Sequence, residues 1–200
     1  IQPFFFSHAD KENATQTYAT ITKYFVISVS FILMFVIVFI DLLKILLVPN
    51  SNYWDAMNVV PLIVMANFFL GIYTNLSVWY KLIDKTHVGA IISIIGAILT
   101  LAINFWLVPT MSYYGSAIAT IVAYGSMMFI SYYLGQKKYP IPYDMEKIAG
   151  YIGVSALLSG LSFYIPALRH SYIFGIFALI LFAYYIYRNE KVTILKIIKK

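Results

Sequence analysis

Amide and hydroxyl side chains recur at helical spacing inside two long apolar stretches of this 200-residue chain. In the stretch 56–80, one helical face would carry residues at i, i+4, i+7 and i+8: Asn67, Gly71, Thr74 and Asn75. The stretch 86–107 has a longer row of small and weakly polar residues: Gly89, Ser93, Gly96, Ala97, Thr100 and Asn104. An amide offers hydrogen-bond donors and acceptors, and a hydroxyl can also bond back to its own helix. These side chains could therefore line a polar cavity or only bridge a seam between helices.

Residues for acid–base or metal chemistry lie outside the apolar stretches. The eight Asp and Glu residues all fall in loops or at helix ends, and His87 and His170 stand alone. His8 lies near Asp10 and Glu12, but no second ligand cluster accompanies it, so a solvated loop is expected. The chain has no Cys, no Gly-rich phosphate loop and no HExxH motif. We expect no catalytic residues, no metal and no cofactor, and hence not an enzyme.

The composition favours an integral membrane protein. Hydrophobic residues make up 62% of the chain and charged residues 11%, against about 25% charged in ordinary soluble domains. The net charge is +6, but the basic residues lie between and after the apolar runs rather than along one face. This placement indicates orientation in a membrane and argues against a nucleic-acid partner.

The apolar runs predict an all-α integral membrane protein with about six transmembrane helices. A run of about twenty residues rising 1.5 Å each covers a bilayer core of about 30 Å. The expected spans are 21–40, 56–80, 86–107, 114–134, 148–165 and 171–187, with a basic tail at 188–200. Between the third and fourth spans we expect the helix to break at Pro109, with Trp106, Tyr113 and Tyr114 at the headgroup level.

Small residues and aromatics give three further expectations. The segment 41–47 is predicted to form a short amphipathic turn or helix, followed by Tyr53 and Trp54 at a membrane interface. Two rows of small residues in the last two spans are predicted to be packing seams: Ala149, Gly153, Ala156 and Gly160, and Ser171, Gly175 and Ala178. The tail is predicted to be a surface helix on anionic lipid or a frayed end.

Four segments carry a resemblance to a known family: QPFFF at 2–6, GIYTNLSVWYKLIDKT at 71–86, GAILTLAINFWLVPTMSYYGSAIAT at 96–120 and YYLGQKKYPIPY at 132–143. The chain resembles the C-terminal part of a bacterial polysaccharide biosynthesis (O-antigen, lipid-linked oligosaccharide) flippase of the multidrug/oligosaccharidyl-lipid/polysaccharide exporter superfamily. Ser116 stands where Ala is commoner. The resemblance covers about the first 145 residues well and the last two spans only in hydropathy. The start at Ile1, without Met or a signal pattern, agrees with a piece of a longer protein.

The resemblance implies that residues 1–200 form one lobe of a two-lobed flippase in the bacterial cytoplasmic (inner) membrane. Alternating access would carry an undecaprenyl-diphosphate-linked oligosaccharide to the outer leaflet for surface polysaccharide (lipopolysaccharide) biosynthesis. The expected partners are this substrate, the missing N-terminal lobe, membrane lipids, and a polysaccharide polymerase and glycosyltransferases. Because amides and hydroxyls suit sugar hydroxyls, the candidate cavity residues are Asn67, Thr74, Asn75, Ser93, Thr100 and Asn104.

Two alternatives remain open. One is an exporter of the same superfamily whose cargo is a peptidoglycan precursor or a drug. The other is an integral-membrane glycan polymerase or acyltransferase, which would call for a larger external loop or an in-membrane His or acidic site. Neither of those features is visible in the sequence.

The basic residues predict the orientation. With six spans both ends lie on one side, and that side receives most of the positive charge: Lys11, Lys23, Lys81, Lys85, Lys137, Lys138, Lys147 and the five basic residues from Arg188 onward. The other side receives Lys44 and Arg169. Because short cytoplasmic loops are enriched in Lys and Arg, both ends of the segment are predicted to be cytoplasmic.

A single cysteine tests this orientation, since the chain has none of its own. A Lys138→Cys variant in intact cells should stay unreactive toward a membrane-impermeant thiol reagent and should react after the membrane is permeabilised. Labelling of this position from outside intact cells would overturn the predicted orientation.

Overall fold

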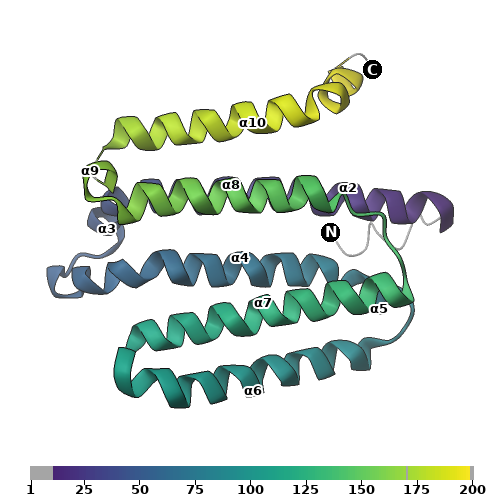
Figure 1. Ribbon diagram of the computed structural model, residues 1–200, viewed down its shortest axis with the longest axis horizontal. Coiled ribbons are helices and arrows are strands. Elements are labelled where there is room, and N and C mark those ends of the chain that lie inside the picture. The colour runs from purple at the N-terminus through teal and green to yellow at the C-terminus, as the bar shows by residue number, and fades with distance from the viewer. Residues whose placement is uncertain (1–10, 170, 199–200) are drawn as a thin grey trace. The chain divides into compact units, whose positions relative to one another are not determined.

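The computed structural model describes residues 11–169 and 171–198, and every regular element in these ranges is a helix (Figure 1). The α-helices are α2 (Lys11–Val38), α3 (Ile40–Leu47), α4 (Val60–Leu76), α5 (Val78–Leu82), α6 (Thr86–Met111), α7 (Tyr113–Lys138), α8 (Met145–Tyr164), α9 (Pro166–Arg169) and α10 (Tyr172–Ile198). A 3-10 helix, η1 (Ser51–Val59), precedes α4. The all-α prediction is confirmed for these residues.

Five segments are long and apolar enough to cross a membrane: Ala14–Val38, Ser51–Leu82, Thr86–Met111, Tyr113–Lys138 and Tyr172–Lys191. These segments contain most of five predicted spans and have the character of a multi-pass membrane protein. The remaining predicted span, 148–165, lies in α8. The first turn of that helix carries two charged residues, Glu146 and Lys147, which shorten its apolar part. Its transmembrane position therefore stays a prediction.

The chain divides into two compact units. The first unit comprises Ile1–Phe25 and Leu62–Asp144, and the second comprises Val26–Pro61 and Met145–Lys200. All six candidate cavity residues belong to the first unit, on α4 and α6.

In the first unit α6 and α7 form a tight antiparallel hairpin (Figure 1). Ser112 alone connects them, with φ 52° and ψ −133°. The expected break at Pro109 is wrong, because α6 continues to Met111 and the Ser112 N–H donates to the Val108 carbonyl at 2.9 Å. Pro109 lacks an N–H and its ring crowds the carbonyl one turn back, but the residues after it keep their own N–H groups and continue the helix for a short distance.

Gly115, at the start of α7, lies too close to α6 for a larger residue. A Cβ atom on Gly115 would lie 2.7 Å from the carbonyl carbon of Leu107 in α6. Real Cβ atoms essentially never approach another heavy atom so closely. The close return of the chain therefore requires glycine at this position.

In the second unit α8 and α10 lie beside each other and run in opposite directions, joined through α9 (Figure 1). The predicted seam on α8 is wrong, because a Cβ atom on Gly153 or Gly160 would have no neighbour within 4 Å. The buried face of α8 instead carries larger and hydroxyl side chains: Ile148, Tyr151, Ser155, Ser159, Ser162 and Phe163. Because this face is buried, the glycine row lies on another side of α8.

The seam predicted on α10 is confirmed at two of its positions. Gly175 and Ala178 are buried, and a Cβ atom on Gly175 would overlap Cγ1 of Val38 at the end of α2. Phe39 and Tyr172 stack beside this contact, with ring centroids 6.3 Å apart. The small residue at this point leaves room for the Val38 side chain.

The two glycines make a matched pair for a stability measurement. We expect Gly175→Leu to lower the free energy of unfolding by about 1–3 kcal/mol or more, because the new side chain must displace Val38. Gly153→Leu should be neutral or stabilising by up to about 1 kcal/mol, since leucine has the higher helix propensity. Thermal unfolding of both variants in detergent provides the comparison. Equal losses would contradict the packing described for α8 and α10.

Candidate functional site

The six candidate cavity residues differ in exposure. Asn67, Thr74 and Ser93 are exposed, whereas Asn75, Thr100 and Asn104 are half-buried. The small residues of the rows on α4 and α6 do not contact each other. A Cβ atom on Gly71 of α4 would contact Phe25 of α2, and one on Gly96 of α6 would overlap Met127 of α7. Each row therefore packs against a different neighbour.

Three of the polar side chains bond to their own helices. The Thr74 hydroxyl donates to the Gly71 carbonyl at 2.7 Å, and the Thr100 hydroxyl donates to the Gly96 carbonyl at 2.9 Å. An N–H of the Asn67 amide donates to the Ile63 carbonyl, also at 2.9 Å. These bonds satisfy one donor of each side chain and leave acceptor capacity for another group.

Asn75 takes part in a bond between helices of the first unit. The Thr22 hydroxyl of α2 donates to Asn75 Oδ1 at 2.9 Å, and Thr22 is buried. Thr22 is also hydrogen-bonded to the Tyr143 hydroxyl, in the connection between α7 and α8. Burial raises the pKa of Tyr143 above its ordinary value; the Thr22 bond lowers it, and the neighbouring Tyr132 adds to the rise. This network gives Asn75 a structural role, while its predicted cavity role stays a prediction.

Asn104 differs from the other candidates. Its amide oxygen is buried and accepts no hydrogen bond. A buried polar atom left without a partner costs about 1–3 kcal/mol. Of the six candidates, this side chain has the strongest physical need for a polar neighbour.

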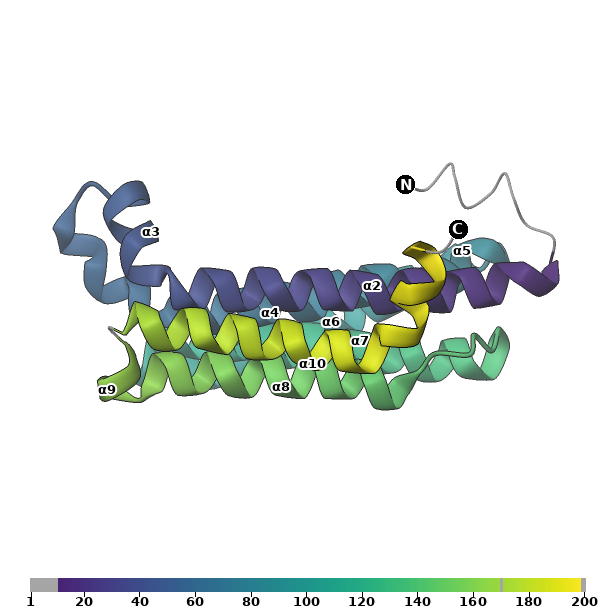
Figure 2. The ribbon, with the colours of Figure 1, turned by 90° about the horizontal axis from the view of Figure 1, so that it is seen from above.

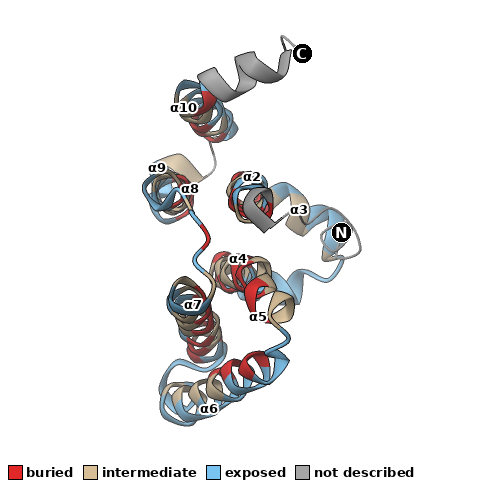
Figure 3. Ribbon diagram, turned by 90° about the vertical axis from the view of Figure 1, so that its right-hand side faces the viewer, coloured by how far each residue is buried: buried red, intermediate tan, exposed pale blue. Residues whose placement is uncertain are grey.

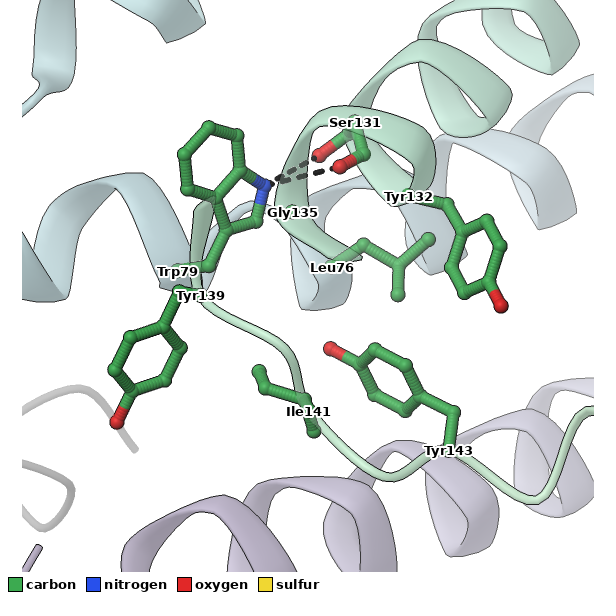
Figure 4. A pocket seen from close by; sticks show the side chains of 8 residues that line it. All are labelled: Leu76, Trp79, Ser131, Tyr132, Gly135, Tyr139, Ile141 and Tyr143. Carbon is green, nitrogen blue, oxygen red and sulfur yellow. Dashed lines mark hydrogen bonds between the residues drawn. The ribbon is translucent and has the colours of Figure 1, made fainter. Parts of the chain in front are cut away.

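Trp79 of α5 forms a packed aromatic cluster with α7 rather than a binding pocket (Figure 4). Trp79 is 1% exposed, and its indole N–H points to Ser131, 3.0 Å from the carbonyl oxygen and 3.4 Å from the hydroxyl. A Cβ atom on Gly135 would lie 2.8 Å from Trp79 Cδ1. The space that these residues share with Ile141 and Tyr143 is too small for a water molecule. This cluster fixes α5 against α7.

The prediction that every carboxylate lies in a loop or at a helix end is wrong for Glu190, which lies within α10 and is buried. Glu190 of α10 is 1% exposed, and its Oε1 accepts a hydrogen bond from the Tyr151 hydroxyl at 3.0 Å. The Lys147 ammonium lies 3.3 Å from the same oxygen and is 35% exposed. Lys147 and Tyr151 are spaced i, i+4 on α8, so both can reach one acceptor. Sequence spacing shows that pair, but not its partner on another helix.

Among the described residues, no three His, Asp or Glu side chains are close enough together to hold a metal ion. Comparisons with protein-family models, with curated proteins and with solved structures each found no match.

The Glu190 cluster leads to a stability prediction. Glu190→Leu removes the acceptor of the Tyr151 hydroxyl and should lower the free energy of unfolding by about 1–3 kcal/mol. Glu190→Gln keeps an acceptor oxygen and should lose less. Thermal unfolding in detergent measures both, with Glu146→Gln as the control because Glu146 is an exposed carboxylate of α8. A Gln variant as unstable as the Leu variant would contradict the role given to the Tyr151 bond.

Proposed function

We propose that this chain forms one lobe of a bacterial flippase that moves a lipid-linked oligosaccharide across the cytoplasmic membrane by alternating access. The substrate would be an undecaprenyl-diphosphate-linked repeat unit used in surface polysaccharide biosynthesis. The observation that carries the proposal is the set of neutral hydrogen-bonding side chains on otherwise apolar helices, together with the resemblance of 71–86 and 96–120 to this family.

Exposed polar side chains inside an apolar helix favour polar surroundings. Asn67 is exposed within the candidate span Ser51–Leu82, and Ser93 is exposed within Thr86–Met111. Such side chains can face lipid, a wet cavity or another part of a longer protein. Placing an amide in lipid costs free energy, because lipid tails offer no hydrogen bonds. A cavity that carries sugar hydroxyls would supply them.

Because the candidate side chains are neutral, we expect the two lobes of the transporter to bind different parts of the substrate. Amides and hydroxyls suit sugars, but a diphosphate calls for cations. In the proposed transporter the missing N-terminal lobe supplies those cations, and this lobe contacts the glycan.

The proposal also places α8 across the membrane as the sixth span. At 20 residues α8 is long enough to cover about 30 Å, and it runs antiparallel to the candidate span in α10. An even number of spans places both ends of the segment on the cytoplasmic side, as the distribution of Lys and Arg indicates.

Substitutions in the full-length protein separate transport from stability. Asn67→Leu should reduce surface polysaccharide export several-fold at matched expression, because it removes an exposed acceptor for sugar hydroxyls. Asn104→Leu should reduce export less, because the Asn104 amide oxygen is buried. Asn104→Leu should leave the free energy of unfolding unchanged or raise it by up to about 1–3 kcal/mol, since it removes a buried oxygen without a partner.

Two other variants serve as controls. Asn75→Leu should lose stability, because Thr22 loses its acceptor. Thr120→Val should export normally, because Thr120 lies on α7 outside the candidate set and its hydroxyl donates to the Ser116 carbonyl of its own helix. Normal export by the Asn67 variant would rule out this glycan-contacting surface.

A further inference from the structure

The outward side of α3 is aliphatic. Leu42, Ile45 and Leu46 are spaced i, i+3 and i+4, and they are 53%, 65% and 73% exposed. Ile40, on the opposite side of the helix, is buried at 3%. A helix on a water-facing surface shows the reverse arrangement, with apolar side chains inward and polar ones outward. The exposed row therefore fits an apolar environment.

The position of α3 in the chain, between two candidate spans, indicates that this apolar environment is the membrane. The candidate span Ala14–Val38 ends just before α3, and the span Ser51–Leu82 begins shortly after it. A short connection between two spans must lie at one membrane surface. Phospholipid is therefore the neighbour that α3 meets as a direct consequence of the fold.

The direction of α3 agrees with this placement. Figure 2 shows α3 turning away from the line of α2. In Figure 3, where α2 is seen end-on, α3 extends sideways from it. The turn occurs at Phe39, whose φ of −97° and ψ of 18° leave the regular helix. If α2 crosses the bilayer, α3 lies along its surface.

Polar and aromatic groups suited to the headgroup region flank the aliphatic row. Lys44 Nζ lies 3.1 Å from Asp41 and 4.9 Å from the ring centroid of Trp54. The Trp54 indole N–H donates to the Val48 carbonyl at 3.1 Å. Tryptophan is enriched at the membrane–water interface, and a lysine there can face lipid phosphates.

Helix η1, which follows α3 in the chain, is held in place by a hydrogen bond to Arg169. Arg169 Nη2 donates to Asn58 Oδ1 of η1 at 2.7 Å, and the Arg169 guanidinium lies 4.3 Å from the centroid of the Phe163 ring. These contacts connect η1 to α8 and α9 within the second unit. The start of the span Ser51–Leu82 is thus tied to α8 and α9.

We propose that α3 is an interfacial helix that inserts Leu42, Ile45 and Leu46 into the phospholipid leaflet, with Lys44 and Trp54 at the headgroups. This amphipathic anchor sets the depth of the second unit in that leaflet. The inference depends on the membrane-spanning character of the neighbouring helices and not on the transported cargo.

Spin labels on single cysteines test the proposal in the full chain, reconstituted in phospholipid bilayers. The label variants are Leu42→Cys, Ile45→Cys and Leu46→Cys, with Ser51→Cys as an exposed polar control in the same connection. Collision rates are measured with oxygen, which concentrates among acyl chains, and with a water-soluble nickel chelate. At the three apolar positions oxygen accessibility should exceed nickel accessibility several-fold, and at Ser51 the order should reverse.

Two results would overturn the proposal. High nickel accessibility at all three positions would mean that the row faces water. Immobile labels protected from both reagents would mean that protein covers the row, either the rest of a longer chain or a second copy. Thermal unfolding of each labelled variant verifies that the substitution has not disrupted the fold.

Discussion

A backbone surrounded by lipid has no water to bond, so each apolar stretch of this chain has to satisfy its own N–H and C=O groups. Helices do this within a single segment, which accounts for the helical character of every regular element in residues 11–169 and 171–198. Helix α6 illustrates the strength of the requirement. Pro109 removes one donor, yet the helix continues to Met111 because the next N–H groups still find acceptors.

The same environment changes how the helices associate. Lipid tails are as apolar as leucine, so close packing and hydrogen bonds between helices replace the hydrophobic effect. In the first unit Gly115 lets α7 return against α6, and Thr22 bonds to Asn75. In the second unit Gly175 brings α10 against Val38, and Glu190 joins α10 to Tyr151. Each unit thus combines a small-residue contact with a polar bond.

A rocking lobe needs both a polar inner surface and a stable position in the bilayer. The neutral side chains on α4 and α6 belong to the first unit, and the proposed interfacial helix α3 belongs to the second. The two proposals assign these tasks to different parts of the chain. They are independent, because lipid contact at α3 does not require a particular cargo on α4 or α6.

Sequence alone determined the helical class, the approximate limits of five apolar helices and the amphipathic segment after the first span. Periodicity and length suffice for these, because backbone satisfaction and bilayer thickness constrain each helix separately. The helix end near Pro109 was misplaced by a few residues, since a proline close to a helix terminus removes only one bond.

Only the tertiary structure decided which faces pack. The rows containing Gly153 and Gly175 look alike in sequence, yet a Cβ atom would have no neighbour at the first and would overlap Val38 at the second. The exposed amide of Asn67, the bonded amide of Asn75 and the buried oxygen of Asn104 also could not be told apart from their spacing. Spacing places residues on a common helical face, but the rotation of that face is set by side chains on other helices, such as Thr22 against Asn75 and Tyr151 against Glu190.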